Sequence, residues 1–192
     1  MRKMVVASYL SLDGVTENPM WTMPYLNDEI AQANFDGTMA ADALLLGRVT
    51  YQGFAASWST PEHEAWMNAT FPTLPPGAFN TQMNGMKKHV VSRSLQDLPW
   101  NNSSLVTGNV VEEIRHLKAQ PGRDILVNGS GTLIQTLIEH DLIDEYWLTV
   151  FPIVIGQGQR LFQSDQPVKL KLLETITFKT GVVRLKYVPD RS

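Results

Sequence analysis

"ILVNGSGTLIQTLI", residues 125 to 138, is the stretch that decides the fold. The apolar run at its start is typical of a buried strand, and the apolar residues three and four apart at its end predict a helix. Between them, "NGSGT" (128–132) supplies small, turn-forming residues. A strand that turns directly into a helix is the repeating unit of a parallel sheet, because parallel strands need a crossover connection.

The same order of elements recurs along the chain. Strands are predicted at 4–10, 41–47, 89–92, 104–108, 124–129 and 144–154, and helices at 27–41, from Thr50 onward, at 110–119 and at 132–142. Residues 55–86 hold four prolines, and we expect them to be irregular apart from a short helix over 61–70. Residues 168–189 predict two long strands joined near 179–181.

This alternation predicts an α/β fold with three layers. Its centre would be a mostly parallel twisted sheet with helices on both faces, finished by an antiparallel C-terminal hairpin. No repeat and no linker interrupts the pattern, so we expect a single domain over residues 1–192.

The composition excludes several classes of function. A net charge of −3 and a pI near 5.8 argue against non-specific nucleic-acid binding, which needs a basic face. The chain has no cysteine and its four histidines lack metal-ligand spacing, so we expect no metal site. No apolar run reaches the ~20 residues of a membrane span. We therefore expect a cytoplasmic protein whose partner is a small molecule, not a nucleic acid or a membrane.

The residues that follow the predicted strands carry the strongest functional signal. In an open α/β sheet, ligands bind beyond the carboxyl ends of the strands. Four of five strand ends carry glycine, and four carry a hydroxyl or an arginine. These ends are Asp13-Gly14, Gly47-Arg48 with Thr50, Ser92-Arg93, Thr107-Gly108 and Gly129-Ser130-Gly131-Thr132. Their recurrence predicts one ligand site at this edge of the sheet.

The stretch "NGSGT" suits a phosphate group. Backbone N–H groups and the helix dipole can meet an anion there at close range, since glycine leaves room and permits positive φ. Thr132 would either cap the helix or bond the phosphate. The stretch lacks the third glycine of the dinucleotide fingerprint, where Ile134 stands, and no Walker lysine follows. A plain strand-to-helix turn is therefore an equal alternative for this stretch alone.

Arg48 and Arg93 are both post-strand arginines. Arginine binds phosphate bidentately, so the two could hold two phosphates of a dinucleotide or the extra 2′-phosphate of NADP. A surface salt bridge is the better explanation for one arginine alone. Two arginines at two strand ends, each beside a hydroxyl, favour the phosphate interpretation.

Five stretches, in this order, resemble the dihydrofolate-reductase-like superfamily. The resemblance is strongest to the branch that includes the C-terminal reductase domain of bifunctional riboflavin-biosynthesis enzymes, and it covers about residues 2 to 188. The stretches are "SLDGV" (11–15), "LLLGRVTY" (44–51), "KKHVVSRSL" (87–95), "ILVNGSGTLIQTLI" (125–138) and "DEYWLTVFPIVIGQGQRLF" (144–162).

The resemblance implies an NADPH-dependent reductase. It places Gly47, Arg48 and Thr50 along the cofactor, with Arg48 on the phosphates. It places Ser92 and Arg93 on the adenosine 2′-phosphate, and it makes Gly129, Ser130, Gly131 and Thr132 the cradle of the pyrophosphate. Relatives often have two adjacent glycines where this chain has Gly129-Ser130.

The substrate half rests on two acidic positions. Dihydrofolate reductases carry an acid on the first helix that binds the pterin and assists its protonation, and Asp28 or Glu29 lies near that place. First-turn acids that favour the helix dipole are an equal explanation. Asp13 would lie on the nicotinamide side and position the substrate, or serve as a turn residue before Gly14. We retain Asp13 and Asp28 as the catalytic candidates.

Aromatic residues offer a second clue to the substrate. Trp21, Trp58 and Trp66 fall in predicted loop regions, where they would stack on a flat heterocycle or pack the long loop onto the body.

The sequence thus predicts a reductase of a heterocyclic substrate. The favoured substrate is the ribosylaminopyrimidine of riboflavin synthesis, 5-amino-6-(5-phosphoribosylamino)uracil. The alternatives are dihydrofolate reduction and an NADP-binding regulatory protein without turnover. Relatives of this branch are often dimers, so we expect a homodimer.

Overall fold

The computed structural model describes residues 1–163 and 167–192, which form one eight-stranded sheet with seven helices around it. The strands are β1 (Met4–Ser11), β2 (Ala41–Gly47), β3 (Lys87–Val91), β4 (Ser103–Val106), β5 (Asp124–Asn128), β6 (Glu145–Phe151), β7 (Leu170–Thr177) and β8 (Val183–Pro189). The helices are η1 (Pro19–Tyr25), α1 (Asp28–Met39), α2 (Arg48–Trp58), α3 (Pro61–Thr70), α4 (Ala78–Gly85), α5 (Val110–Ala119) and α6 (Gly131–Glu139).

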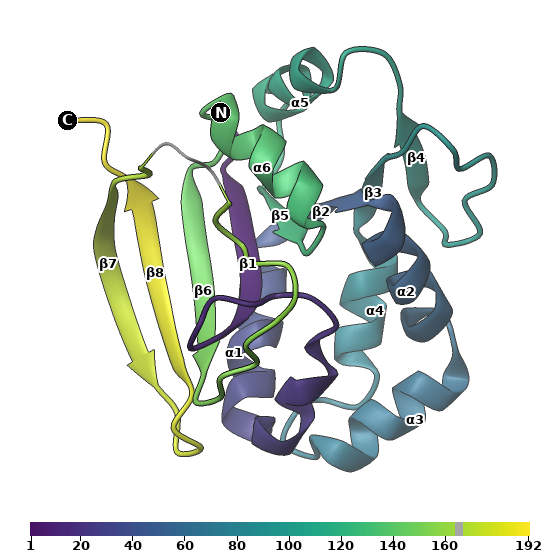
Figure 1. Ribbon diagram of the computed structural model, residues 1–192. Coiled ribbons are helices and arrows are strands. Elements are labelled where there is room, and N and C mark those ends of the chain that lie inside the picture. The colour runs from purple at the N-terminus through teal and green to yellow at the C-terminus, as the bar shows by residue number, and fades with distance from the viewer. Residues whose placement is uncertain (164–166) are drawn as a thin grey trace.

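The strand order is β4-β3-β2-β5-β1-β6-β8-β7. All pairs from β4 to β6 are parallel, whereas β8 pairs antiparallel with both β6 and β7. Figure 1 shows the β7–β8 hairpin at one edge of the sheet and helices α2, α3 and α4 gathered on the other side of the molecule. The predicted α/β class, with its parallel sheet and antiparallel C-terminal hairpin, is confirmed.

Helices cover both faces of the central strands, as the unbroken apolar sequence of β2 requires. Leu45 packs in a core with Ile114 of α5 and Ile134 of α6, while its neighbour Leu44 packs on the other face in a core with Tyr51 of α2. Successive strand residues point to opposite faces, so a strand buried on both sides reads as a continuous apolar run. Figure 1 shows this sandwich of sheet and helices.

Within 55–86 the predicted short helix over 61–70 is confirmed, but the prediction that the rest is irregular is wrong. Helix α2 extends to Trp58, α3 covers 61–70 and α4 covers 78–85. Pro61 begins α3 at its first turn, where the missing N–H costs nothing. The other prolines lie in the short connection at 71–77, which ends at Gly77 with φ 71°. Proline content therefore marked helix boundaries here and not the absence of helices.

Helix α1 begins where the sequence predicts. The Asn27 side chain accepts a hydrogen bond from Ile30 N at 3.0 Å, which caps the helix. Gly37 lies inside this helix and makes room for Trp147, because a Cβ at Gly37 would come within 2.7 Å of the indole. Among the described residues, no helix combines the length and apolarity that a bilayer span requires.

Candidate functional site at the strand ends

The carboxyl ends of β3, β2, β5 and β1 meet at one edge of the sheet, because these strands are adjacent and parallel. The residues predicted to bind the cofactor all follow these ends. We use the term strand-end edge for residues Gly47–Thr50, Ser92–Arg93 and 129–132.

Two of the strand-to-helix junctions interlock at this edge. A Cβ at Gly47 would overlap the Ser130 side chain, so Ser130 lies directly over Gly47. On the other side, a Cβ at Gly129 would come within 2.9 Å of the Thr50 hydroxyl oxygen. The structure thus brings together four of the predicted site residues from two distant parts of the sequence. The two glycines therefore make room for the Ser130 and Thr50 side chains, a packing role that the sequence did not indicate.

The two helices that begin at this junction have free first turns. Neither α2, preceded by Gly47, nor α6, preceded by Ser130, has a side-chain N-cap hydrogen bond. Helices α1, α3 and α5 are capped by Asn27, Thr60 and Asn109, respectively. The first N–H groups of a helix need a partner, and together with the dipole they favour an anion. The α2–α6 junction therefore offers donors from two helices at one place.

The conformation of the β5–α6 turn corrects one alternative for Thr132. Helix α6 begins at Gly131, and its N-cap position is Ser130 in the left-handed region at φ 62°. Thr132 is exposed and lies inside the first turn. It therefore does not cap the helix, and its hydroxyl remains one of the polar groups at the start of α6.

The two predicted arginines lie at the surface of this edge. Arg48 donates a hydrogen bond to Gln52 Oε1 at 3.2 Å, and its side chain is exposed. Arg93 is also exposed. Among the described residues neither arginine pairs with a carboxylate, so the surface salt bridge considered as their alternative role is not formed there.

Ser92 shapes the turn that presents Arg93. Its hydroxyl oxygen accepts hydrogen bonds from Ser94 N at 3.2 Å and Leu95 N at 3.0 Å. This is a local side-chain turn of the kind that serine favours at strand ends. The hydroxyl proton is not used in these two bonds, so Ser92 can still donate to an anion.

The segment that follows β6 lies within the stretch 144–162 that carries the family resemblance, but no role is predicted for its Gln159 and Arg160. Gln159 lies against the start of α6, since a Cβ at Gly131 would come within 2.6 Å of its Nε2 atom. Arg160 donates from Nε to the Asp13 carbonyl at 2.9 Å and is itself exposed, so it is a third arginine near the edge. No local pattern marks either residue, because their positions depend on contacts with a loop more than 140 residues earlier.

The two catalytic candidates have opposite environments. The Asp13 carboxylate accepts hydrogen bonds from the Ser11 hydroxyl at 2.7 Å, Ile155 N at 3.1 Å and Gly156 N at 2.8 Å. These bonds, led by the one from Ser11, lower the pKa of Asp13 to about 2. In Asp28, by contrast, Oδ1 is buried and has no hydrogen-bond partner among the described residues.

Glu29, the neighbour of Asp28, is committed to the C-terminal hairpin. Its carboxylate pairs with the Lys179 ammonium at 2.8 Å and accepts a hydrogen bond from Lys179 N at 3.2 Å. The hydrogen bonds from Lys179 lower the pKa of Glu29. Of the two first-turn acids, Asp28 is thus the one with a free buried oxygen.

The tryptophans differ from their predicted setting. Trp58 ends α2 and Trp66 lies inside α3, so neither is in a loop. The Trp58 ring packs 5.0 Å from the Phe79 ring, which makes it part of the helical core. Trp21 lies in η1 and packs edge-on against Phe151, the last residue of β6, with 5.6 Å between ring centroids. Only Trp21 lies beside a strand end.

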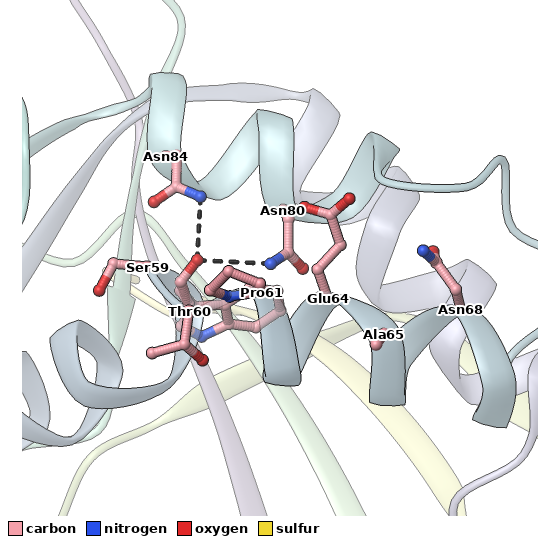
Figure 2. Close-up of a pocket in the computed structure, with 9 residues that line it drawn as sticks. Ser59, Thr60, Pro61, Glu64, Ala65, Asn68, Asn80 and Asn84 are labelled. Atoms are coloured by element: carbon pink, nitrogen blue, oxygen red, sulfur yellow. Dashed lines mark hydrogen bonds between the residues drawn. The ribbon is translucent and has the colours of Figure 1, made fainter.

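A separate cleft lies between α2, α3 and α4 (Figure 2). We call it the asparagine cleft; it has a volume of about 340 Å³ and is lined by Trp58, Ser59, Thr60, Pro61, Glu64, Ala65, Asn68, Asn80 and Asn84. It shares no residue with the strand-end edge. Figure 2 shows that Asn80 and Asn84 both donate to one carbonyl, that of Trp58, at 3.3 and 2.9 Å.

Most polar groups of the asparagine cleft are used by the fold. The Asn84 side chain also accepts a hydrogen bond from the Trp100 indole at 2.6 Å, and Asn68 accepts one from Gly77 N at 3.0 Å. Thr60 caps α3. These bonds satisfy the free ends of helices. We therefore place the candidate site at the strand-end edge and not in the asparagine cleft.

Known proteins share this sequence and this architecture. Residues 2–184 match the family model of the RibD C-terminal domain. The chain is 38% identical over 106 residues to the uncharacterized protein YyaP of Bacillus subtilis (strain 168); the match spans 55% of this chain and 56% of YyaP.

Two solved structures show the same fold at low identity. A putative riboflavin biosynthesis protein from Shewanella sp. PV-4 superposes with a TM-score of 0.74 at 23% identity, covering 98% of this chain and 99% of that one. Dihydrofolate reductase from Enterococcus faecalis, complexed with NADP(H) and RAB-propyl, superposes with a TM-score of 0.60 at 13% identity, covering 98% and 96%. The chain therefore belongs to the RibD C-terminal domain family, and its fold is dihydrofolate-reductase-like.

Proposed function

We propose that the protein is an NADPH-dependent reductase of a heterocyclic substrate, with 5-amino-6-(5-phosphoribosylamino)uracil as the first candidate. One observation carries the cofactor: the uncapped N-termini of α2 and α6 meet at one place, beside exposed Arg48 and Arg93, which have no carboxylate partner among the described residues. A dinucleotide supplies the separate phosphates that such an arrangement suits. The membership of the RibD C-terminal domain family supports the substrate.

Each residue of the strand-end edge has a role in this proposal. First-turn N–H groups of α6 would hold the pyrophosphate, and Arg48 would bind it from the start of α2. Arg93 would bind the adenosine 2′-phosphate bidentately, with the Ser92 hydroxyl as a second donor. When bound, NADPH supplies the hydride.

The substrate would lie between η1, β6 and the start of α1. Trp21 and Tyr25 pack edge-on against the buried Phe151, at 5.6 and 5.9 Å between ring centroids, and their half-buried rings give this region an aromatic wall. Asp28 stands at the first turn of α1 with its buried oxygen free to bind a ring N–H or to pass a proton. Asp13 is less suited to this role, because three hydrogen bonds already occupy its carboxylate oxygens.

Dihydrofolate reduction is the second candidate. The free oxygen of Asp28 favours it, because an acid on the first helix is the group that dihydrofolate reductases use for the pterin. An NADP-binding protein without turnover is the remaining alternative. It predicts tight NADPH binding with no oxidation of the nucleotide by either substrate.

The cofactor is tested first, by thermal-shift titration with NADPH and NADH. A nucleotide at ~100 times its dissociation constant should stabilise the fold by roughly 2.7 kcal/mol. We expect Arg93→Ala to remove the preference for NADPH over NADH, while Arg115→Ala, an exposed arginine on α5, keeps it. A protein that melts at the same temperature with and without either nucleotide would contradict the proposal.

The substrate is tested by following NADPH oxidation with each candidate. Asp28→Asn should slow turnover strongly and leave NADPH affinity unchanged, whereas Glu29→Gln, its neighbour bound to Lys179, should retain turnover. Equal losses in both variants would show that Asp28 has no special role. Turnover of dihydrofolate alone would select the second candidate.

A further inference from the structure

The loop after β1 and the segment after β6 are bound to each other along their lengths. We call residues 12–17 and 153–161 together the two-loop clasp. Val15 and Arg160 form an antiparallel bridge. The bridge consists of the hydrogen bonds from Thr16 N to Gln159 O at 2.9 Å and from Leu161 N to Gly14 O at 3.1 Å, and a third bond joins Leu12 N to Ile153 O at 2.8 Å. Both parts follow strands that end beside the strand-end edge.

Asp13 is the side-chain anchor of the clasp. Its two carboxylate oxygens accept hydrogen bonds from consecutive amides, Oδ1 from Ile155 N at 3.1 Å and Oδ2 from Gly156 N at 2.8 Å. The Ser11 hydroxyl, which is buried, donates to Oδ1 at 2.7 Å and fixes the orientation of the carboxylate. Charge-assisted bonds of this kind are stronger than neutral ones.

The far end of the clasp carries Gln159 to α6. Glu17 Oε2 accepts a hydrogen bond from Gln159 N at 3.0 Å, which holds this residue from the first loop. Gly158, at φ 112°, lets the chain pass close to Val15, since a Cβ there would come within 3.0 Å of the valine. The Gln159 side chain then lies against Gly131, the first residue of α6.

We propose that Asp13 is a positioning residue, which holds the 155–160 segment so that the Gln159 amide reaches a cofactor phosphate at the start of α6. This inference rests on the proposed function, because it concerns the same cofactor. The amide N–H₂ of glutamine is a neutral donor that can bond a phosphate oxygen. Asp13 contributes by fixing the loop, and the hydrogen bonds that do so occupy its carboxylate oxygens.

A double-mutant cycle on NADPH affinity tests whether Asp13 acts through Gln159. Asp13→Asn places an amide donor where the carboxylate accepts from two N–H groups, so it should release the loop. We expect Asp13→Asn and Gln159→Ala each to weaken NADPH binding about tenfold, the size of one lost hydrogen bond to a charged group. The double variant should bind no worse than Asp13→Asn alone, since both changes remove the same contact.

Gln157→Ala is the matched control, an exposed glutamine in the same segment with no hydrogen bond among the described residues. It should bind NADPH like the wild type. Amide hydrogen exchange provides the readout of loop position: Asp13→Asn should speed exchange at Ile155 and Gly156, whereas Gln159→Ala should leave both amides protected.

The outcomes separate this inference from the function on which it rests. A wild-type protein that binds neither NADPH nor NADH would overturn both. If the wild type binds NADPH, then unchanged affinity in Asp13→Asn, or losses that add in the double variant, would overturn the positioning role alone. A loss of turnover in Asp13→Asn at unchanged NADPH affinity would show instead that Asp13 acts on the substrate.

Discussion

The strand-end edge and the asparagine cleft both gather polar side chains, but they use them differently. In the cleft, Asn80 and Asn84 donate to the last carbonyl of α2, and Asn84 also accepts from Trp100. At the edge, two helices begin without a side-chain cap. A cleft whose polar groups are already bonded within the protein has little left for a ligand. The meeting of two uncapped helix starts beside Arg48 and Arg93, and not the volume of a cleft, identifies the site.

The largest expected effect comes from filling the space between Gly47 and Ser130, where the two junctions of the edge meet. Gly47→Ala adds a Cβ that overlaps Ser130, so the β2–α2 and β5–α6 turns must move apart. We expect a loss of about 3 kcal/mol in the free energy of unfolding, as for overpacked cores. NADPH binding should weaken at least about tenfold, because the donors of the two helices lose their mutual placement.

Urea denaturation and nucleotide titration measure these two losses. Gly53→Ala is the control, since a Cβ at Gly53 in the same helix α2 meets nothing within 4 Å. Normal stability in Gly47→Ala would mean that the junction is loosely packed, and the comparison with the cleft would lose its basis.

The next effect concerns a buried cation beside the cleft. The Lys88 side chain is fully buried, its ammonium donates to Asn84 O at 2.7 Å, and it lies 4.3 Å from the centre of the Trp100 ring. Burial lowers the pKa of Lys88 to about 8 from its usual 10.5. Between these two values the unfolded chain binds more protons than the folded protein, so stability should rise with pH in that window.

Lys88→Met removes this dependence. At neutral pH the wild type must keep a charge in the core, so the methionine variant should be more stable by at most about 3 kcal/mol. Urea melts should show this difference in stability between the two proteins at neutral pH. The difference should shrink near pH 10.5, because the lysine loses its proton in both the folded and the unfolded state. A wild type whose stability does not change with pH would show that Lys88 keeps an ordinary pKa.

A smaller effect tests the structural role of the cleft. Asn84→Ala removes partners from both Trp58 O and the Trp100 indole, and unfolding should become easier by about 2 kcal/mol. Asn68→Ala, at the exposed end of the cleft, should cost well under half of that. NADPH binding should not change in either variant. Weaker NADPH binding in Asn84→Ala would bring the cleft back as a ligand site.

The smallest effect should be a gain. Ser130 adopts φ 62°, a left-handed conformation that costs a residue with a Cβ roughly 1 kcal/mol relative to glycine. Ser130→Gly should therefore raise the free energy of unfolding by up to about 1 kcal/mol and also widen the space over Gly47. Thermal melts with and without NADPH measure both effects. A destabilised variant would show that the Ser130 contact with Gly47 outweighs its backbone strain.

Local signals in the sequence were sufficient for the regular half of the fold. Helix α5 spans the predicted residues 110–119, because Asn109 caps it and its apolar stripe has helical spacing. In the segment 55–86 the sequence predicts α3 but not α4, because the prolines before α4 hide a helix that is stabilised by packing on α1 and α2. Phe79 of α4, for example, packs against Phe35 of α1 at 5.6 Å.

The candidate site divides in the same way. The sequence by itself determined the parallel sheet and the residues at its strand ends, since the glycines, hydroxyls and arginines of a strand-to-helix turn are neighbours in the sequence. Only the tertiary structure decided that Ser130 lies over Gly47, that Asp13 is saturated while Asp28 keeps a free oxygen, and that Gln159 reaches α6. The physical reason is range: periodicity and turn chemistry act between near neighbours, whereas these contacts join residues far apart in the chain.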